Sequence, residues 1–282
     1  MTDREYPEHQ EVKVKKLNCW EEFENEVSAI FLDIESRRKQ TIFHVSHPLF
    51  RGHAKESWKL KTTLERYSEK VYSITDFYEI LLSVEPAVAS FTSKSWNLDP
   101  KLRIDEKYYG PPPGYDFMIY LRHHGFPSPL LDWSRSPYIA AFFAFQPRLE
   151  KNESNIAIYA FVEYYEKSEM VSPRRADYAH IIGLGPYVQT HKRHFIQQCE
   201  YTICKKLVGE SYIYSNHEEA FNINKMEGEI RKEMLIKYLI PIAERSKVLS
   251  KLDIMNINSY SLFIDEESLM ETLAYQNIEK NN

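Results

Sequence analysis

The clearest hydrophobic pattern in the chain lies between residues 121 and 146, LRHHGFPSPLLDWSRSPYIAAFFAFQ. The bulky run at residues 130–133 is short and follows a proline, which favours a strand over a helix. Ser136 and Pro137 are typical of a helix start, because serine can cap the helix and proline fits its first position. The residues that follow are apolar nearly all round, so the pattern predicts a buried helix over residues 137–145. Residues 132–136 then bring polar side chains to a helix N-terminus, where backbone N–H groups favour anions.

The remaining pattern predicts mixed helices and strands. Apolar residues at helical spacing predict an amphipathic helix over residues 18–38 and a second helix that opens at Thr75-Asp76, which Pro86 should kink or shorten. Two more helices are predicted at 245–256 and 265–276, the latter capped by Asp265. A strand is predicted at residues 41–45 with its exit through residues 48–52, and further strands are predicted at 156–162, 196–204, 211–214 and 234–242. The polar residues 1–16 are expected to be mobile, and residues 94–116 and 165–190 to be loops. Because strands and helices mix without βαβ alternation, the predicted fold class is α+β.

The composition of the chain indicates what class of protein it is. With 282 residues, 43% of them hydrophobic and 27% charged, the chain is an ordinary folded protein, and no linker divides it. The net charge of −5 gives no overall attraction to nucleic acid, although a local basic groove remains compatible with it. The three cysteines have neither disulfide-framework nor zinc spacing. The N-terminus lacks the apolar core of a signal peptide and no run is long enough to span a membrane, so we expect a cytoplasmic protein.

Four segments of the sequence carry a resemblance to a known family. They are Phe50-Arg51-Gly52 with Trp58-x-Leu60 and Leu64-x-Arg66; His123-His124-Gly125-x-Pro127 with Leu130-Leu131-Asp132-Trp133-Ser134-x-Ser136-Pro137 and Ala141-x-Phe143-Ala144; Gln197-Gln198-Cys199-Glu200-Tyr201-Thr202; and Tyr238-Leu239-Ile240-Pro241 with the Leu252 and Phe263 segment. Together they resemble the FRG domain over roughly residues 41–270. The sequence departs from the family pattern at three positions, where Arg122 and His53 each replace a usual glutamine and Pro129 replaces a usual arginine.

The order of these motifs also resembles the Arg–Ser–Glu pattern of ADP-ribosyltransferases. In this chain the pattern falls on Arg51, on Ser134-x-Ser136 and on Gln198-x-Glu200. The resemblance implies a split-sheet core like that of the ADP-ribosyltransferases, with flanking helices, and NAD as co-substrate without a metal. We therefore expect residues 1–40 to form a tail and an N-terminal helical extension, and residues 41–276 to form the FRG-like domain.

The chemistry of NAD suits these residue types. Cleavage of its glycosidic bond resembles glycoside hydrolysis, with an oxocarbenium-like transition state. Arg51 would clamp the phosphates, because a guanidinium binds phosphate oxygens bidentately and stays charged, and Gly52 would let the ligand approach the backbone. Ser134 or Ser136 would hold a ribose hydroxyl, and His124 is a further candidate for contact with the cofactor. Glu200 would stabilise the oxocarbenium ion, and Gln198, which alternation places on the same strand face, would orient the acceptor.

Each of these residues also has a structural interpretation. Arg51 could be the buried partner of Asp132, because buried charges need partners. Ser136 could be a helix cap alone, worth ~1 kcal/mol. Asp132 and Trp133 are expected to be structural, the acid tying a loop and the indole packing. Glu200 could be a solvated residue on a strand face, where glutamates are usually exposed.

Basic residues near Gln198 bear on the acceptor. A local basic patch near Gln198 would consist of His180, His191, Arg193 and His194. The pairs Arg174-Arg175 and Lys192-Arg193 would help a phosphate-bearing acceptor to bind. The sequence thus predicts an NAD-dependent ADP-ribosyltransferase that modifies RNA or a protein, in the setting of a toxin or antiphage effector held by an antitoxin or chaperone partner. One alternative is an FRG module that binds a nucleotide or RNA without chemistry, and a nuclease is another.

Overall fold

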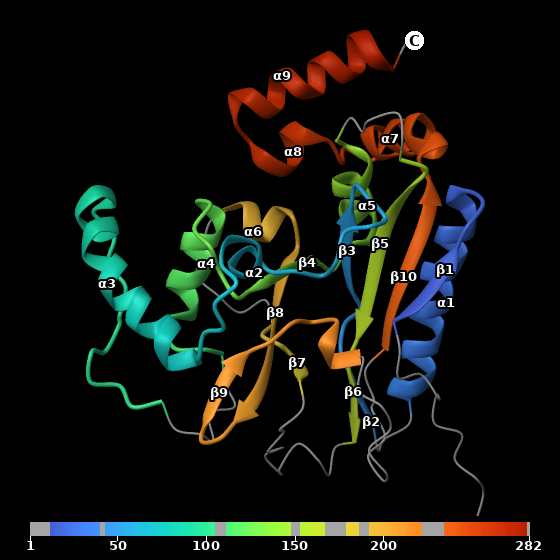
Figure 1. Ribbon diagram of the computed structural model, residues 1–282. Coiled ribbons are helices and arrows are strands. Elements are labelled where there is room, and N and C mark those ends of the chain that lie inside the picture. The colour runs from blue at the N-terminus through green and yellow to red at the C-terminus, as the bar shows by residue number, and fades with distance from the viewer. Residues whose placement is uncertain are drawn as a thin grey trace, which may run out of the picture.

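The computed structural model describes residues 12–39, 43–104, 111–147, 153–166, 179–185, 192–221 and 234–280. Helices and strands are mixed along the chain, so the predicted α+β class is confirmed (Figure 1). No helix among the described residues is both long and apolar enough to cross a membrane.

The core of the fold is a sheet built from strands that are far apart in the sequence. Eight described strands form it in the order β1-β10-β5-β3-β4-β8-β7, with β9 paired to β8. Their bounds are β1 (Lys13–Lys16), β3 (Leu49–His53), β4 (Leu131–Ser134), β5 (Asn155–Val162), β7 (His180–Gly183), β8 (Cys199–Val208), β9 (Ser211–Tyr214) and β10 (Met234–Pro241). Strand β1 runs parallel to β10, and the other pairs are antiparallel. A separate two-stranded sheet joins β2 (Phe43–Val45) to β6 (Tyr164–Glu166).

The large sheet is nearly divided at its centre. Strand β3 pairs with β5 over five residues but with β4 through one pair only, Phe50 opposite Ser134. The β10-β5-β3 half and the β4-β8-β7 half therefore diverge from this point (Figure 1). Such a divergence exposes strand edges and side chains that a continuous ladder would cover.

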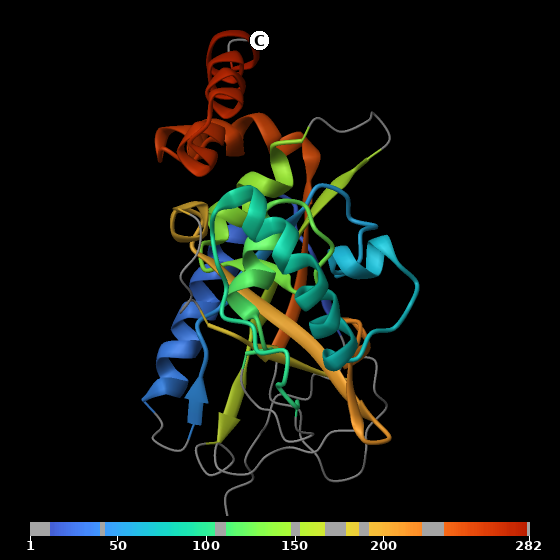
Figure 2. The same ribbon diagram turned by 90° about the vertical axis from the view of Figure 1, so that its left-hand side faces the viewer.

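Each half of the sheet has its own helices. The first half packs against α1 (Trp20–Arg38), α5 (Pro137–Phe145) and α7 (Arg245–Ile254), whose buried aromatic and aliphatic side chains join those of β5 and β10 in one core. The second half packs against α3 (Ile74–Thr92) and α4 (Tyr115–His123), which lie in front of β8 in Figure 2. The short helices are α2 (Thr63–Tyr67), α6 (Lys192–Ile196) and α8 (Ser259–Phe263), and α9 (Glu266–Ala274) ends the chain's regular α-helices. The opposite face of the sheet carries a smaller core around Trp133, Tyr159 and Phe161.

Most predicted elements are present, and the differences have local causes. Pro86 lies inside α3, which continues to Thr92, so the expected shortening was wrong. Residues 13–16 form an edge strand rather than a mobile tail; residues 1–11 lie outside the described part. The predicted strand at 196–204 begins only at Cys199, because Lys192–Ile196 is helical and Gln198 has a φ of 50°. Residues 180–183, expected in a loop, pair with β8.

Candidate functional site

A cavity of about 310 Å³ lies where the two halves of the sheet separate. Among the described residues it is lined by Phe50, Arg51, Gly52, Asp132, Trp133, Ser134, Ala140, Phe143, Gln197, Cys199 and Phe263. Three segments that the sequence analysis singled out, at 50–52, 132–134 and 197–199, therefore meet at one place. The register explains the meeting, because Ser134 stands opposite Phe50 on one side and Cys199 on the other.

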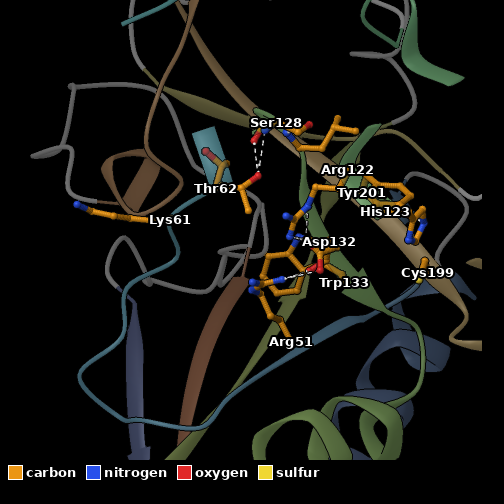
Figure 3. Close-up of polar contacts among 12 residues, drawn as sticks. Arg51, Lys61, Thr62, Arg122, His123, Ser128, Asp132, Trp133, Cys199 and Tyr201 are labelled. Atoms are coloured by element: carbon orange, nitrogen blue, oxygen red, sulfur yellow. Dashed lines mark hydrogen bonds and ion pairs between the residues drawn. The ribbon is translucent and has the colours of Figure 1, made fainter. Parts of the chain in front are cut away.

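Arg51 is held at this cavity by Asp132 (Figure 3). Its Nη1 donates to the Asp132 backbone oxygen at 2.6 Å and lies 3.2 Å from the carboxylate oxygen Oδ2. Arg122, from α4, donates from Nε to Oδ1 of the same carboxylate at 3.1 Å, and its Nη2 pairs with that oxygen. The two arginine side chains are 14% and 15% exposed, whereas the aspartate side chain is 39% exposed. Burial opposes ionisation of Asp132, but the charges of Arg51 and Arg122 outweigh it and hold the pKa of Asp132 below its usual range.

His53 fixes the other side of the Arg51 guanidinium. Arg51 Nε donates to His53 Nε2 at 3.0 Å, so Nε2 acts as an acceptor and the ring is neutral. The remaining ring nitrogen, Nδ1, faces the Trp58 backbone oxygen at 3.4 Å. Burial lowers the pKa of His53 to about 3, with the positive charge of Arg51 as the second cause. His53 thus adds no charge to the site at neutral pH.

Gly52 has a packing task that the sequence did not reveal. A Cβ atom at this position would lie 1.9 Å from the backbone oxygen of Ala140 and 2.8 Å from the backbone nitrogen of Ala144. Only glycine lets α5 pack this closely against β3. Gly52 also lines the cavity, so the predicted ligand approach stays a prediction beside this structural role.

The two serines before α5 differ in their roles. Ser136 is the N-cap of α5 and accepts from the Ile139 N–H at 3.3 Å, as the cap interpretation predicted. Ser134 is buried, donates to the Gln197 backbone oxygen at 2.8 Å and accepts from the Ser136 N–H at 3.0 Å. It lines the cavity, whereas Ser136 is not among the described lining residues. Ser134 therefore ties β4 to the turn before β8 at the wall of the cavity.

Glu200 lies on the strand next to the cavity but is not among the described residues that line it. It stands opposite Trp133 in the ladder and follows Cys199, so its side chain leaves the face on which Cys199 lies. The side chain is 12% exposed, and Oε1 lies 3.7 Å from Arg135 Nε, a nitrogen that has no hydrogen-bond partner among the described residues. Burial raises the pKa of Glu200, and Arg135 opposes the rise. The alternative that Glu200 is a solvated residue on a strand face is therefore wrong, because its side chain is buried.

Gln198 does not share a strand face with Glu200, in contrast to the prediction. It is exposed, has a φ of 50° and precedes the first residue of β8. Its backbone oxygen accepts from the Arg135 N–H at 3.0 Å. The left-handed backbone turns the chain from α6 into β8, which ends the alternation that the prediction relied on.

The remaining predicted site residues lie apart from the cavity lining. His124 is exposed at the end of α4, with its ring 4.4 Å from that of Tyr120. Arg193 pairs with Asp265 at 2.6 Å and donates to the Phe263 backbone oxygen, and His194 is buried with its ring stacked on Tyr201. Both side chains are thus engaged within the protein, so the predicted acceptor patch is not formed by them. Of the other basic residues predicted to help, His180 lies in β7, whereas Arg174, Arg175 and His191 lie outside the described residues.

Sequence reasoning missed three residues at this site. Arg122 was noted only as a departure from a family pattern, and His53 likewise. His217 is fully buried behind the sheet, where Trp133 Nε1 donates to Thr202 Oγ1 and that oxygen lies 2.8 Å from His217 Nε2. Burial lowers the pKa of His217 to about 3, and Arg51 contributes. The His53 contact lies within reach of local spacing, because residues two apart on one strand share a face, whereas Arg122 meets Asp132 and His217 meets Thr202 only through the packing of separate segments. Among the described residues, no group of three or more His, Cys, Asp or Glu side chains could hold a metal ion.

Comparison with known proteins identifies part of the chain. Residues 46–153 match the model of the FRG domain family, which confirms the resemblance over that stretch. It includes β3, α4, β4 and α5, and so Arg51, Arg122, Asp132 and Ser134. Neither a curated protein nor a solved structure matches the chain.

Proposed function

We propose that this chain, which contains an FRG domain, transfers ADP-ribose from NAD to an RNA or protein acceptor. The observation that carries the proposal is the convergence of Arg51, Ser134 and the segment that precedes Glu200 on one cavity. The cavity lies at the lower end of the volumes of small-molecule sites, about 300 to 1,000 Å³, so we expect it to hold part of the dinucleotide. The split of the sheet between β3 and β4 gives the ligand access to both halves.

Each residue has a role in this reaction. Arg51 binds the phosphates of NAD, and Ser134 orients the ribose next to nicotinamide. The acceptor oxygen or nitrogen forms a bond to the anomeric carbon as the bond to nicotinamide breaks. Nicotinamide leaves as a neutral base with the bonding electrons, and the acceptor releases its proton. Positive charge accumulates on the ribose in between, and Glu200 as a carboxylate stabilises it.

Catalysis requires that the Glu200 carboxylate reach the bound ribose. Its carboxylate pairs with Arg135 at 3.7 Å and lies beyond the described lining of the cavity, so it has to turn or the ligand has to extend toward it. This observation favours a second candidate function, in which the FRG domain binds a nucleotide without chemistry. Arg51 and Ser134 serve a binding module equally well.

Labelled NAD separates the two functions. We expect the purified protein, incubated with cell RNA and cell protein, to release nicotinamide and to leave adenylate label on one of the two fractions. Glu200→Gln should reduce transfer by a factor of about 100 or more, as when one stabilising group is removed from an active site. Glu210→Gln, at an exposed residue in the turn between β8 and β9, is the matched control and should retain activity.

Two results would reject the transferase. Nucleotide affinity without nicotinamide release over hours would leave the binding module, and loss of RNA that chelator abolishes and NAD does not affect would indicate a nuclease. The effector setting has its own test: expression of the chain in bacteria should slow growth, and Glu200→Gln should restore it. A partner protein that restrains the toxin should be recovered with the active chain.

A further inference from the structure

The cavity between the two halves of the sheet has walls of two kinds. Strands β3 and β4 contribute its charged and hydroxyl groups, on Arg51, Asp132 and Ser134. Helices α5 and α8 contribute two aromatic rings, Phe143 and Phe263. Both rings are only partly buried, although each also packs against the core. The phosphate and ribose contacts proposed above use the strand side, so they leave the aromatic wall without a role.

Phe143 reaches the cavity because of helical spacing. Ala140, which also lines the cavity, precedes it by three residues, and residues three apart lie on the same face of a helix. The close approach of α5 to β3 at Gly52 brings this face of the helix to the cavity. Gly52 and Ala140 are small, so the space beside the Phe143 ring stays open.

Phe263 is held at the cavity by residues of α6 and of the turn before β8. Arg193 Nε donates to the Phe263 backbone oxygen at 3.1 Å, and the guanidinium carbon lies 5.4 Å from the centroid of the Phe263 ring. Gln197, which is buried and itself lines the cavity, donates from Nε2 to the Leu262 backbone oxygen at 3.0 Å. These bonds fix the last two residues of α8, so Phe263 is positioned without a ligand.

The two phenylalanine rings form a corner. Their centroids are 6.0 Å apart and their planes are inclined by 81°. A third flat ring that enters such a corner stacks on the face of one ring and meets the edge of the other, the two arrangements that aromatic pairs favour. Apart from Arg51 and Asp132, which pair with each other, no described residue of the lining is charged. The corner thus suits a flat ring whose attached anionic group lies at Arg51.

We propose that Phe143 and Phe263 bind a planar aromatic ring of the nucleotide whose phosphate Arg51 binds. Adenine and nicotinamide share this chemistry, and NAD contains both. Of the two phenylalanines, Phe143 lies within the stretch that matches the FRG family and Phe263 lies beyond it. Ring binding therefore requires a C-terminal helix that the family match does not include. This inference deepens the proposed function and rests on it for the identity of the ligand.

Calorimetric titration of the full chain with four ligands separates the ring from the phosphate. AMP and ADP carry adenine, nicotinamide mononucleotide carries nicotinamide, and ribose 5-phosphate carries no ring. We expect AMP or nicotinamide mononucleotide to bind about fivefold or more tightly than ribose 5-phosphate, because stacking of a base on an aromatic side chain contributes about that much. Phe143→Leu and Phe263→Leu should each reduce this advantage by about threefold or more. The nucleotide that loses affinity identifies the ring that is bound.

Controls within the same titrations separate ring binding from packing. The affinity for ribose 5-phosphate and the ratio of ADP to AMP affinity should stay within about twofold in both leucine variants, because the phosphate contact at Arg51 is unchanged. Phe263→Tyr, which keeps a ring, should retain the advantage that Phe263→Leu reduces, whereas a role in packing alone would not distinguish the two. Phe91→Leu, at an exposed phenylalanine of α3, is the matched control and should bind all four ligands like the parent chain.

Phe263→Leu keeps the test decisive if Phe143→Leu fails to fold. Equal affinities for AMP, nicotinamide mononucleotide and ribose 5-phosphate, no binding of any of them, or an advantage that a folded leucine variant retains would overturn the subsite. Ring-dependent binding in a chain that releases no nicotinamide from NAD supports the subsite and rejects the transferase. Transfer from NAD with the parent KM in both leucine variants would support the transferase and reject the subsite.

Discussion

Replacement of Gly52 by alanine tests whether the glycine of the FRG tripeptide is required for packing or for ligand approach. The new Cβ would lie 1.9 Å from the Ala140 backbone oxygen, and ordinary contact begins near 3.4 Å. Helix α5 would therefore have to move by the difference, 3.4 − 1.9, or about 1.5 Å. The atoms that obstruct the Cβ belong to backbone, so no side chain can rotate away. Overpacking usually costs about 1–3 kcal/mol. Because a whole helix must move here, we expect a loss of at least about 3 kcal/mol in the free energy of unfolding, out of the roughly 5–15 kcal/mol that folded proteins have.

Urea denaturation measures this loss as a lower midpoint at an unchanged slope. Gly183→Ala in β7 is the matched control, because its Cβ would meet Glu163 Oε2 at 3.5 Å, an ordinary contact. The control should change stability by no more than about 0.5 kcal/mol. If Gly52→Ala unfolded at the parent's midpoint yet lost affinity for ADP, the packing argument would be refuted and the ligand role would take its place.

Four further predictions follow from the buried contacts. His53 and His217 have folded pKa values of about 3 against about 6.5 in the unfolded chain, so the unfolded state takes up protons first and stability falls as pH drops below about 6.5. Between pH 7 and 5, each histidine should lower the free energy of unfolding, measured by urea denaturation, by about 2 kcal/mol. If His217→Gln lost as much stability over this pH range as the parent chain, the explanation would be wrong. Thr202→Val leaves the Trp133 and His217 ring nitrogens unpaired and should destabilise by about 2–4 kcal/mol; an unchanged urea midpoint would show that the bridge is dispensable. The charge of Arg135 lowers the pKa of Glu200, against the effect of burial, so Arg135→Met should raise that pKa further and any transferase activity should require a higher pH. NMR titration of the Glu200 carboxyl carbon measures the shift, and a titration curve like that of the parent chain would exclude the pairing. Arg193→Ala should speed amide exchange in α8 and α9, because Arg193 binds Phe263 and Asp265, while a loss of ADP affinity instead would place it at the ligand.

The periodicity of hydrophobic side chains predicted most of the secondary structure. The buried helix at 137–145 and its Ser136 cap lie where they were predicted. The strand predicted at 156–162 starts one residue earlier, at Asn155. Both depend on interactions within a few residues, which is the range over which a pattern is informative. Where the pattern failed, a tertiary contact intervened: β1 forms only because β10 offers it a partner, and the helix at 192–196 with the left-handed Gln198 cuts the alternation short.

The residues of the candidate site likewise fall into those that the sequence indicates and those that depend on tertiary packing. Its motif residues Arg51 and Ser134 could be chosen from the sequence, and the structure contains the pair with Asp132 that was the structural alternative for Arg51. Arg122 as a second partner could not be found, because ion pairing depends on where α4 packs relative to β4. The orientation of Glu200 toward Arg135 also follows from the ladder rather than from the tripeptide.

Local patterns of residues specify an α+β chain, its main elements and the motif segments that belong near a site, because hydrophobic periodicity and helix caps act over a few residues. Packing in three dimensions set the rest: β3 and β4 are joined by the Phe50–Ser134 pair alone, Arg51 and Arg122 both bind Asp132, and Arg193 is engaged in holding α8 and α9. A charge acts through space, so which groups neutralise one another depends on strand register and helix packing across long separations, such as the 81 residues between Arg51 and Asp132.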